Sequence, residues 1–224
     1  PEIIPEYLKE AQELKSKFQK QITVKTGTEI DFCTSVLQDY RVQILPYLDE
    51  FDYMIGSVHV IRSPEGNFIP IDGGNNPQLM ESIGITKFYQ IYYKELYKMI
   101  KTGYFQIVGH FDLPKKYGIH APEEIWTEIH KILDLIKKSG MAVEINTSGF
   151  RKKVGEQYPS LQIIRELIKR EIPLTLGSDA HKPKNVGYRF PEILEKLRDL
   201  SKQLNTPVFL AKFSDKSKNL IEIR

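Results

Sequence analysis

The chain has 224 residues, with 32 Lys and Arg against 29 Asp and Glu, and 41% of its residues are hydrophobic. These values fit one large globular domain, and the interspersed charges argue against a nucleic-acid groove, which needs clustered basic residues. The single cysteine, Cys33, excludes an intramolecular disulfide and favours a reducing, cytoplasmic compartment. No apolar run approaches the ~20 residues of a membrane span.

Apolar periodicity predicts that helices and strands alternate along the chain. The predicted elements are, in order, a helix over 5–20, a strand over 21–32, a helix over 38–50, a strand over 52–60, a long loop over 61–84, a helix over 86–101, a strand over 104–109, a helix over 122–138, a strand over 141–146, a helix over 161–170, a strand over 172–176, a helix over 191–204 and a strand over 207–213. This alternation predicts a mostly parallel sheet, open or closed, in one domain over residues 1–224.

Polar side chains follow five of the predicted strands, at the point where each apolar run stops. They are Glu29, His59, His110 with Asp112, Glu144 with Asn146, and Asp179 with His181. Ligands of α/β sheets and barrels bind at the carboxyl edge of the strands, where these side chains are expected to meet. Each residue alone has a structural alternative, such as a hydrogen-bonded histidine, but the recurrence favours a shared site.

Carboxylates and imidazoles mixed in one site suit zinc, iron or manganese. Five residues are candidate ligands: Glu29, His59, His110, Asp179 and His181. One zinc ion needs about four ligands, so two ions ~3.5–4 Å apart that share a carboxylate are feasible. Such a centre activates water for the hydrolysis of esters or phosphates.

Basic residues follow two of the same strands. Arg151 precedes Lys152 and Lys153 after the fourth strand, and Lys115 precedes Lys116 after the third. A guanidinium group can bind a phosphate through two parallel hydrogen bonds. A solvated basic loop is the favoured interpretation for Lys152 and Lys153, whereas both interpretations stay open for Arg151.

The ordered motifs resemble the PHP (polymerase and histidinol phosphatase) superfamily and, within it, the monofunctional histidinol-phosphate phosphatases. The matching stretches are Gly27-Thr28-Glu29-Ile30-Asp31, Ile55-Gly56-Ser57-Val58-His59, Ile107-Val108-Gly109-His110-Phe111-Asp112, Val143-Glu144-Ile145-Asn146-Thr147-Ser148-Gly149-Phe150-Arg151-Lys152 and Gly177-Ser178-Asp179-Ala180-His181. Each stretch is weak evidence, but the ordered set is strong. The resemblance implies a distorted (β/α)7 barrel of the TIM type with two or three divalent ions, zinc, manganese or iron, at its carboxyl edge.

The resemblance also implies roles for individual residues. Glu29 would bridge two ions, and the remaining ligands would be His59, His110, Asp179 and His181. Arg151 would hold the substrate phosphate, helped by Lys115 or Lys116, between which the sequence does not choose. Asp112, Glu144 and Asn146 would orient the imidazoles from behind.

The implied reaction is hydrolysis of L-histidinol phosphate to L-histidinol and phosphate, in histidine biosynthesis. Asp179 or His181 would protonate the leaving oxygen only if that residue is not fully committed as a metal ligand. The substrate would be a small phosphate monoester, with no nucleic acid and no membrane as partner. The alternatives are a PHP phosphoesterase acting on nucleotides or phosphotyrosine, and a degenerate barrel that binds without catalysis.

The chain also departs from the family pattern. Members begin with a strand ending in His-x-His and a second short strand carrying another His, and neither is found in this sequence. The chain is therefore expected to be a family member without its first one or two barrel strands. A truncated chain, which opens at Pro1 rather than Met, is favoured over a true variant with a weaker site.

Overall fold

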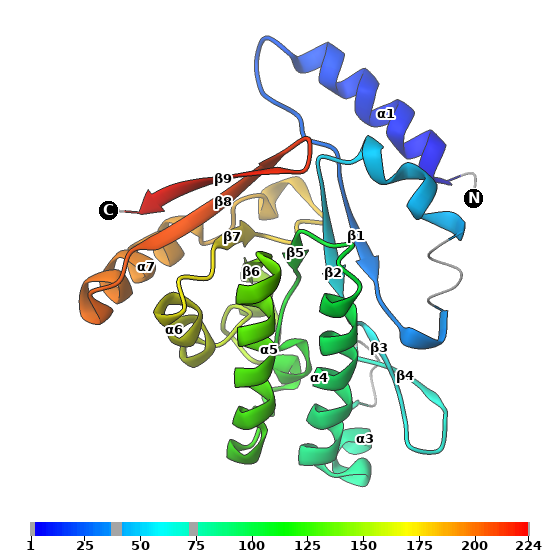
Figure 1. Cartoon of the computed structure of the whole chain (residues 1–224), viewed down its shortest axis with the longest axis vertical. Helices are drawn as coiled ribbons and strands as arrows, with labels where there is room; N and C mark the ends of the chain where they lie inside the picture. The colour runs from blue at the N-terminus through cyan, green and yellow to red at the C-terminus, as the bar shows by residue number, and fades with distance from the viewer. Residues whose placement is uncertain (1–2, 37–41, 72–75, 224) are drawn as a thin grey trace.

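A seven-stranded sheet forms the centre of the computed structural model, which describes residues 3–36, 42–71 and 76–223 (Figure 1). Its strands lie in the order β1-β2-β5-β6-β7-β8-β9, and only the β8–β9 pair is antiparallel. The strands are β1 (Gly27–Asp31), β2 (Tyr53–Ser57), β5 (Ile107–Val108), β6 (Ala142–Asn146), β7 (Leu174–Gly177), β8 (Val208–Ser214) and β9 (Ser217–Ile223). The predicted mostly parallel α/β sheet is confirmed.

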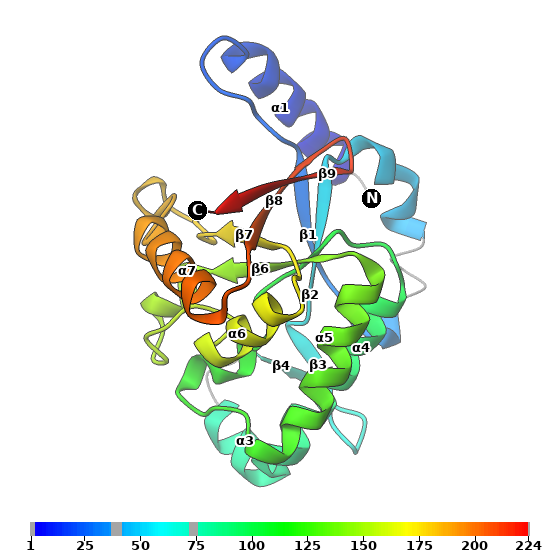
Figure 2. The same ribbon diagram turned by 60° about the vertical axis from the view of Figure 1, so that its left-hand side comes forward.

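Most of the helices cover one face of this sheet, because they carry an apolar stripe at helical spacing. The helices are α1 (Ile3–Phe18), α3 (Asn76–Ile83), α4 (Ile85–Lys101), α5 (Trp126–Ser139), α6 (Leu161–Lys169) and α7 (Phe190–Leu204). The α4 and α5 helices lie side by side (Figures 1 and 2), and the buried side of α5 includes Ile129, Ile132 and Leu133. The α1 helix lies at one end of the molecule and buries only Ala11. None of the helices described is long and apolar enough to cross a membrane.

The sheet is open, with β1 and β9 at its two edges, and the described residues form no closed barrel. Its second face holds a groove of about 600 Å³ whose lining includes Ile55 and Ile107. Glu29 pairs in register with Ile55, which pairs with Ile107. Residues paired in this way project to the same face of a parallel sheet, so Glu29 lies on the grooved face.

The prediction of one long loop over 61–84 is wrong. A hairpin of β3 (Val60–Arg62) and β4 (Phe68–Pro70) occupies its first half, and α3 occupies its end. Ile61 and Ile69 face each other in the hairpin register and are both buried, which stabilises strands too short for a sequence pattern to reveal. Residues 72–75 lie outside the described part.

Two further predictions need correction. Of the helix predicted over 38–50, residues 38–41 lie outside the described part, residues 42–43 are α-helical, and the rest is mainly a 3₁₀ helix, η2 (Leu45–Glu50). The β9 strand was not predicted, because its side chains are exposed except for Ile223 and show no apolar alternation. Its strand conformation comes from pairing with β8 along its whole length.

Candidate active site

Glu29, His59 and His110 form a compact cluster at the carboxyl edge of three adjacent strands. Oε1 of Glu29 lies 3.0 Å from Nε2 of His110 and 3.8 Å from Nε2 of His59. The two imidazole rings meet edge to face, with their centroids 4.7 Å apart. All three offer a ligand atom within 4.8 Å of the others. Adjacency in the order β1-β2-β5 therefore joins residues up to 81 positions apart.

Asp31 supports His59 and was not singled out from the sequence. The backbone N–H of His59 donates to Oδ1 of Asp31 at 2.8 Å, and Nδ1 of the ring lies 3.6 Å from the same oxygen. The available signal was spacing, because Asp31 follows Glu29 by two positions in β1 and so shares its face of the sheet. A carboxylate behind a ligating imidazole fixes the ring orientation and its tautomer.

Glu144 and Asn146 lie behind His110, where they were predicted to orient the imidazole. The backbone N–H of His110 donates to Oε2 of Glu144 at 3.1 Å, and the Asn146 side-chain amide donates to the same oxygen at 3.1 Å. Glu144 therefore holds the His110 backbone, and Asn146 holds Glu144 in place. Nδ1 of His110 is buried and has no hydrogen-bond partner within the described residues.

The charges of the cluster act on one another. Burial by itself would raise the pKa of Glu29, but the hydrogen bond and positive charge of His110 lower it to about 2. Burial lowers the pKa of His110, but the hydrogen bond to Glu29 and the negative charge of Glu29, together with the negative charges of Glu144 and Asp179, outweigh that effect, so the pKa of His110 is raised. Burial raises the pKa of both Glu144 and Asp112.

Asp179 and His181 follow β7 and lie outside the three-residue cluster. Asp179 has a backbone φ of 47°, and His181 is largely exposed, with 86% of its side chain accessible. Nδ1 of His181 lies 3.4 Å from Oδ1 of Asp179. The negative charge of Asp179 nevertheless contributes to the raised pKa of His110. Their roles as ligands stay predictions.

The Arg151 side chain is held against the end of β7. Its Nη2 donates to the carbonyl oxygens of Ser178 and Asp179 at 2.8 and 3.0 Å, and its guanidinium lies 5.5 Å from the Tyr188 ring centroid. Nη1 is buried without a hydrogen-bond partner in the described part of the chain. A fixed guanidinium with one unpaired, buried nitrogen suits the binding of an anion.

The two candidate lysines are both buried. Lys115 donates to Glu156 and to the carbonyl oxygen of Gln157, and its ammonium also pairs with Asp112. The Lys116 ammonium lies 5.5 Å from the Tyr117 ring centroid. Their predicted contact with phosphate is not tested by these distances.

Two imidazoles and one carboxylate form a donor set typical of catalytic zinc, which uses three protein ligands and keeps a further position open. The same donors suit manganese and iron. The unpartnered Nδ1 of His110 and the short Glu29–His110 contact fit a site built for a cation rather than a solvated surface. The residues present therefore fit a divalent metal.

Known proteins share both the sequence and the fold. Residues 2–148 match the family described as PHP domain. A "probable histidinol-phosphatase" from Deinococcus radiodurans is 35% identical over 202 residues, covering 89% of this chain and 73% of that protein. The Bacillus subtilis histidinol-phosphatase is 30% identical over 206 residues, covering 85% of this chain and 75% of that protein.

A solved structure gives the same picture of the fold. The histidinol phosphate phosphatase of Lactococcus lactis, complexed with zinc, L-histidinol and phosphate, superposes with a TM-score of 0.68 at 21% identity, covering 96% of this chain and 79% of that one. Fold and site define a metal-dependent hydrolase of the α/β class. The chain belongs to the PHP domain family and, within it, to the histidinol-phosphatases.

Proposed function

We propose that this protein hydrolyses L-histidinol phosphate to L-histidinol and inorganic phosphate, a step of histidine biosynthesis, with divalent ions at the Glu29–His59–His110 cluster. That cluster is the observation that carries the proposal. The names of the relatives and the zinc, L-histidinol and phosphate of the Lactococcus lactis structure support the substrate and the metal. The single cysteine supports a cytoplasmic location.

Glu29, His59 and His110 would hold the first ion, and Asp179 and His181 would complete a centre of two or three. Bound divalent ions supply positive charge for the phosphoryl oxygens and lower the pKa of a water nucleophile. Asp31 keeps the His59 ring in place, since it contacts both the backbone and the ring of that residue.

Arg151 would bind the phosphate through Nη1. Its Nη2 is already bonded to the carbonyl oxygens of Ser178 and Asp179, so the guanidinium is fixed before the substrate arrives. A preorganised cation stabilises the charge that moves onto the phosphoryl and leaving oxygens without a cost of reorganisation. The three oxygens around Lys115 already use the donors of its ammonium group, which argues against Lys115 as a second phosphate contact.

The leaving alkoxide needs a proton, and the candidate donor is whichever of Asp179 and His181 is not fully committed as a metal ligand. Nδ1 of His181 lies 3.4 Å from Oδ1 of Asp179, and its ring is accessible to a substrate. An imidazole oriented by a carboxylate is a common proton donor. Phosphate monoesters hydrolyse so slowly in water that enzymatic rate enhancements of ~10²¹ are known. We therefore expect bound cations and proton transfer to the leaving oxygen both to contribute to the rate.

The experiment is phosphate release by the purified protein, supplied with Zn²⁺, Mn²⁺ or Fe²⁺, from a panel of monoesters. L-histidinol phosphate should have a kcat/KM at least roughly 100-fold above nucleotides and phosphotyrosine peptides. Hydrolysis of a nucleotide or phosphotyrosine in preference would replace the substrate class. Absence of stoichiometric metal together with absence of any hydrolysis would instead favour a binding role.

A further inference from the structure

Lys115 is buried to 1% exposure and its ammonium group meets three oxygens. Nζ donates to Oε1 of Glu156 at 2.7 Å and to the carbonyl oxygen of Gln157 at 2.8 Å, and it lies 3.2 Å from Oδ2 of Asp112. The Tyr158 ring centroid lies 5.4 Å away and covers the same group. An ammonium has three donors, so these oxygens use its full capacity.

The partners of Lys115 belong to two segments that carry different parts of the site. Asp112 follows the predicted ligand His110 by two positions, and η3 (Leu113–Tyr117) follows at once. Glu156 and Gln157 lie in the segment that runs from Arg151 to α6. Oδ2 of Asp112 also accepts the backbone N–H of Ser160 at 2.9 Å, at the beginning of α6. The lysine is therefore the charged centre of the contact between these segments.

The Arg151 segment is folded tightly against this contact. Asn146 and Tyr158 exchange two backbone hydrogen bonds of 2.7 and 2.9 Å, which close the segment into a loop. A Cβ atom at Gly149 would lie 2.1 Å from the carbonyl oxygen of Glu156, so the loop crosses itself at a distance that only glycine permits. A shift of Glu156 would therefore move the chain next to Arg151.

We propose that Lys115 is a positioning residue that ties the His110–Asp112 strand end to the Arg151 loop and so sets the phosphate-binding guanidinium relative to the metal ligands. It acts through Glu156 and Gln157 rather than by touching the substrate. This role rests on the proposed function, because that proposal assigns phosphate binding to Arg151 and metal binding to His110. Direct contact with phosphate would require Lys115 to give up a buried ionic partner.

Substitutions of Lys115 and of its partner Glu156 distinguish a positioning role from direct phosphate binding, because the two roles predict different effects of Glu156→Ala on phosphate affinity. In the zinc-loaded protein, Lys115→Met and Glu156→Ala should each raise the inhibition constant of inorganic phosphate by about 10–100-fold. Each should also lower kcat several-fold. The double variant should lose no more than Lys115→Met alone, since both act through one contact. If Lys115 bound phosphate itself, Glu156→Ala would leave phosphate affinity unchanged or raise it, and this result would overturn the proposal.

Hydrogen exchange over residues 147–160 gives a readout that does not depend on turnover. Lys115→Met and Glu156→Ala should speed exchange in this loop, whereas loss of a direct phosphate contact would leave it unchanged. Glu156 is 30% exposed, so its variant carries the test if Lys115→Met fails to fold. The matched control is Lys169→Met, which breaks a 2.7 Å pair with Glu166 on α6 and should alter neither kinetics nor exchange in the loop.

The proposed function and the positioning role can fail separately. If wild-type protein does not cleave L-histidinol phosphate, the substrate assignment fails, while phosphate binding and loop exchange still report on Lys115. If wild-type protein cleaves it and Glu156→Ala keeps full phosphate affinity with normal exchange, only the positioning role fails.

Discussion

The Glu29 carboxylate is the centre of the cluster, because one of its oxygens lies within 3.8 Å of a nitrogen on each imidazole. Without a cation, the hydrogen bond and positive charge of His110 stabilise the ionised Glu29 carboxylate, as the lowered pKa of Glu29 indicates. A bound divalent ion would supply this positive charge instead and would use the same imidazole nitrogens as ligands. The cluster is therefore sensitive to the charge of one side chain.

Glu29→Gln keeps the shape of the side chain and removes its charge. We expect zinc affinity to fall by at least roughly 10–100-fold and kcat/KM by a similar factor or more, because an anionic ligand is lost. Metal analysis after gel filtration and phosphate-release kinetics measure the two effects. His130→Gln is the control, since His130 contacts Arg170 on the helical side, and retention of full metal affinity by Glu29→Gln would contradict the assignment.

Gly177 is constrained by close packing rather than by charge. A Cβ atom at this position would lie 1.8 Å from Oε1 of Glu144, whose other oxygen accepts the backbone N–H of His110. Gly177→Ala should displace Glu144, lower stability by about 1–3 kcal/mol through overpacking, and weaken zinc binding through His110. Urea unfolding and zinc titration measure both changes.

The control for Gly177→Ala is Gly140→Asn. Gly140 ends α5 with a φ of 71° and has open space around its Cβ position, and asparagine tolerates this left-handed conformation. Its stability should change by less than about 0.5 kcal/mol. Equal effects of the two substitutions would show that the close approach to Glu144 is unimportant.

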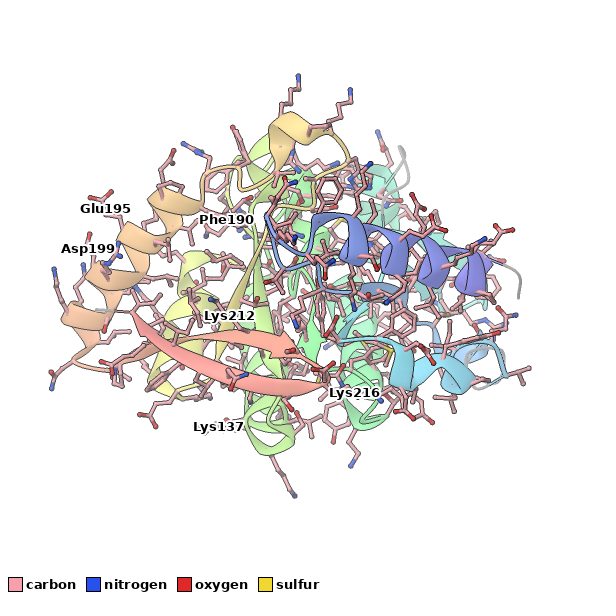
Figure 3. The ribbon with its side chains drawn as sticks, turned by 90° about the horizontal axis from the view of Figure 1, so that it is seen from above. Lys137, Phe190, Glu195, Asp199, Lys212 and Lys216 are labelled. Carbon is pink, nitrogen blue, oxygen red and sulfur yellow. The ribbon has the colours of Figure 1, made fainter. Side chains whose placement is uncertain are left out.

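Among the elements, the β8–β9 hairpin is tied to β2 through Asp52. The buried Asp52 carboxylate accepts the backbone N–H of Asp215 at 3.0 Å and that of Thr26 at 2.7 Å, and it pairs with Lys15 of α1 at 3.2 Å. Lys216, labelled in Figure 3 at the turn of the hairpin, pairs with Asp49. One carboxylate therefore connects the hairpin, α1 and the chain entering β1.

The stability of the protein should depend on pH through this carboxylate. Burial would raise the pKa of Asp52, but the backbone hydrogen bonds from Asp215 and Thr26 and the bond from Lys15 lower it to about 2. Because the folded pKa lies below the unfolded value of about 3.9, the stabilisation is present above pH ~4 and is lost as the pH falls toward 2. Asp52→Asn should cost about 2 kcal/mol at pH 7, and most of this difference should be lost by pH 2.

Denaturant unfolding of both proteins between pH 7 and 2 measures this difference. Asp199→Asn is the control, since Asp199 lies exposed on α7, as Figure 3 shows, and its stability should match wild type throughout. A constant difference between Asp52→Asn and wild type across the whole range would rule out the ionic origin of the effect.

For the whole molecule, metal binding should be coupled to stability, because the cluster joins three strands that only the folded chain brings together. Zinc at 100 times its dissociation constant would stabilise the folded state by about 2.7 kcal/mol. For a chain of this size we expect the Tm to rise by about 5–10 °C when zinc is added to protein stripped with EDTA. Differential scanning calorimetry measures the shift, which Glu29→Gln should largely abolish.

The sequence predicted much of the fold because local patterns record burial. The apolar stripes of α4, α5 and α7 and the apolar runs of β6 and β7 recur at helical or strand spacing, and the structure has these elements within a few residues of their predicted bounds. The hairpin β3–β4 and strand β9 escaped because their conformation depends on pairing between segments rather than on a pattern within one segment.

The site, like the fold, depends partly on local sequence patterns and partly on contacts between distant segments. Polar residues interrupt an apolar run where a strand leaves the core, and this local signal is sufficient to single out Glu29, His59 and His110 from sequence alone. Which candidates meet depends on strand order, which places β1, β2 and β5 side by side and leaves Asp179 and His181 two strands farther along the sheet. The burial of Lys115 among three oxygens likewise arises from contacts between distant segments, so only the tertiary structure could decide it.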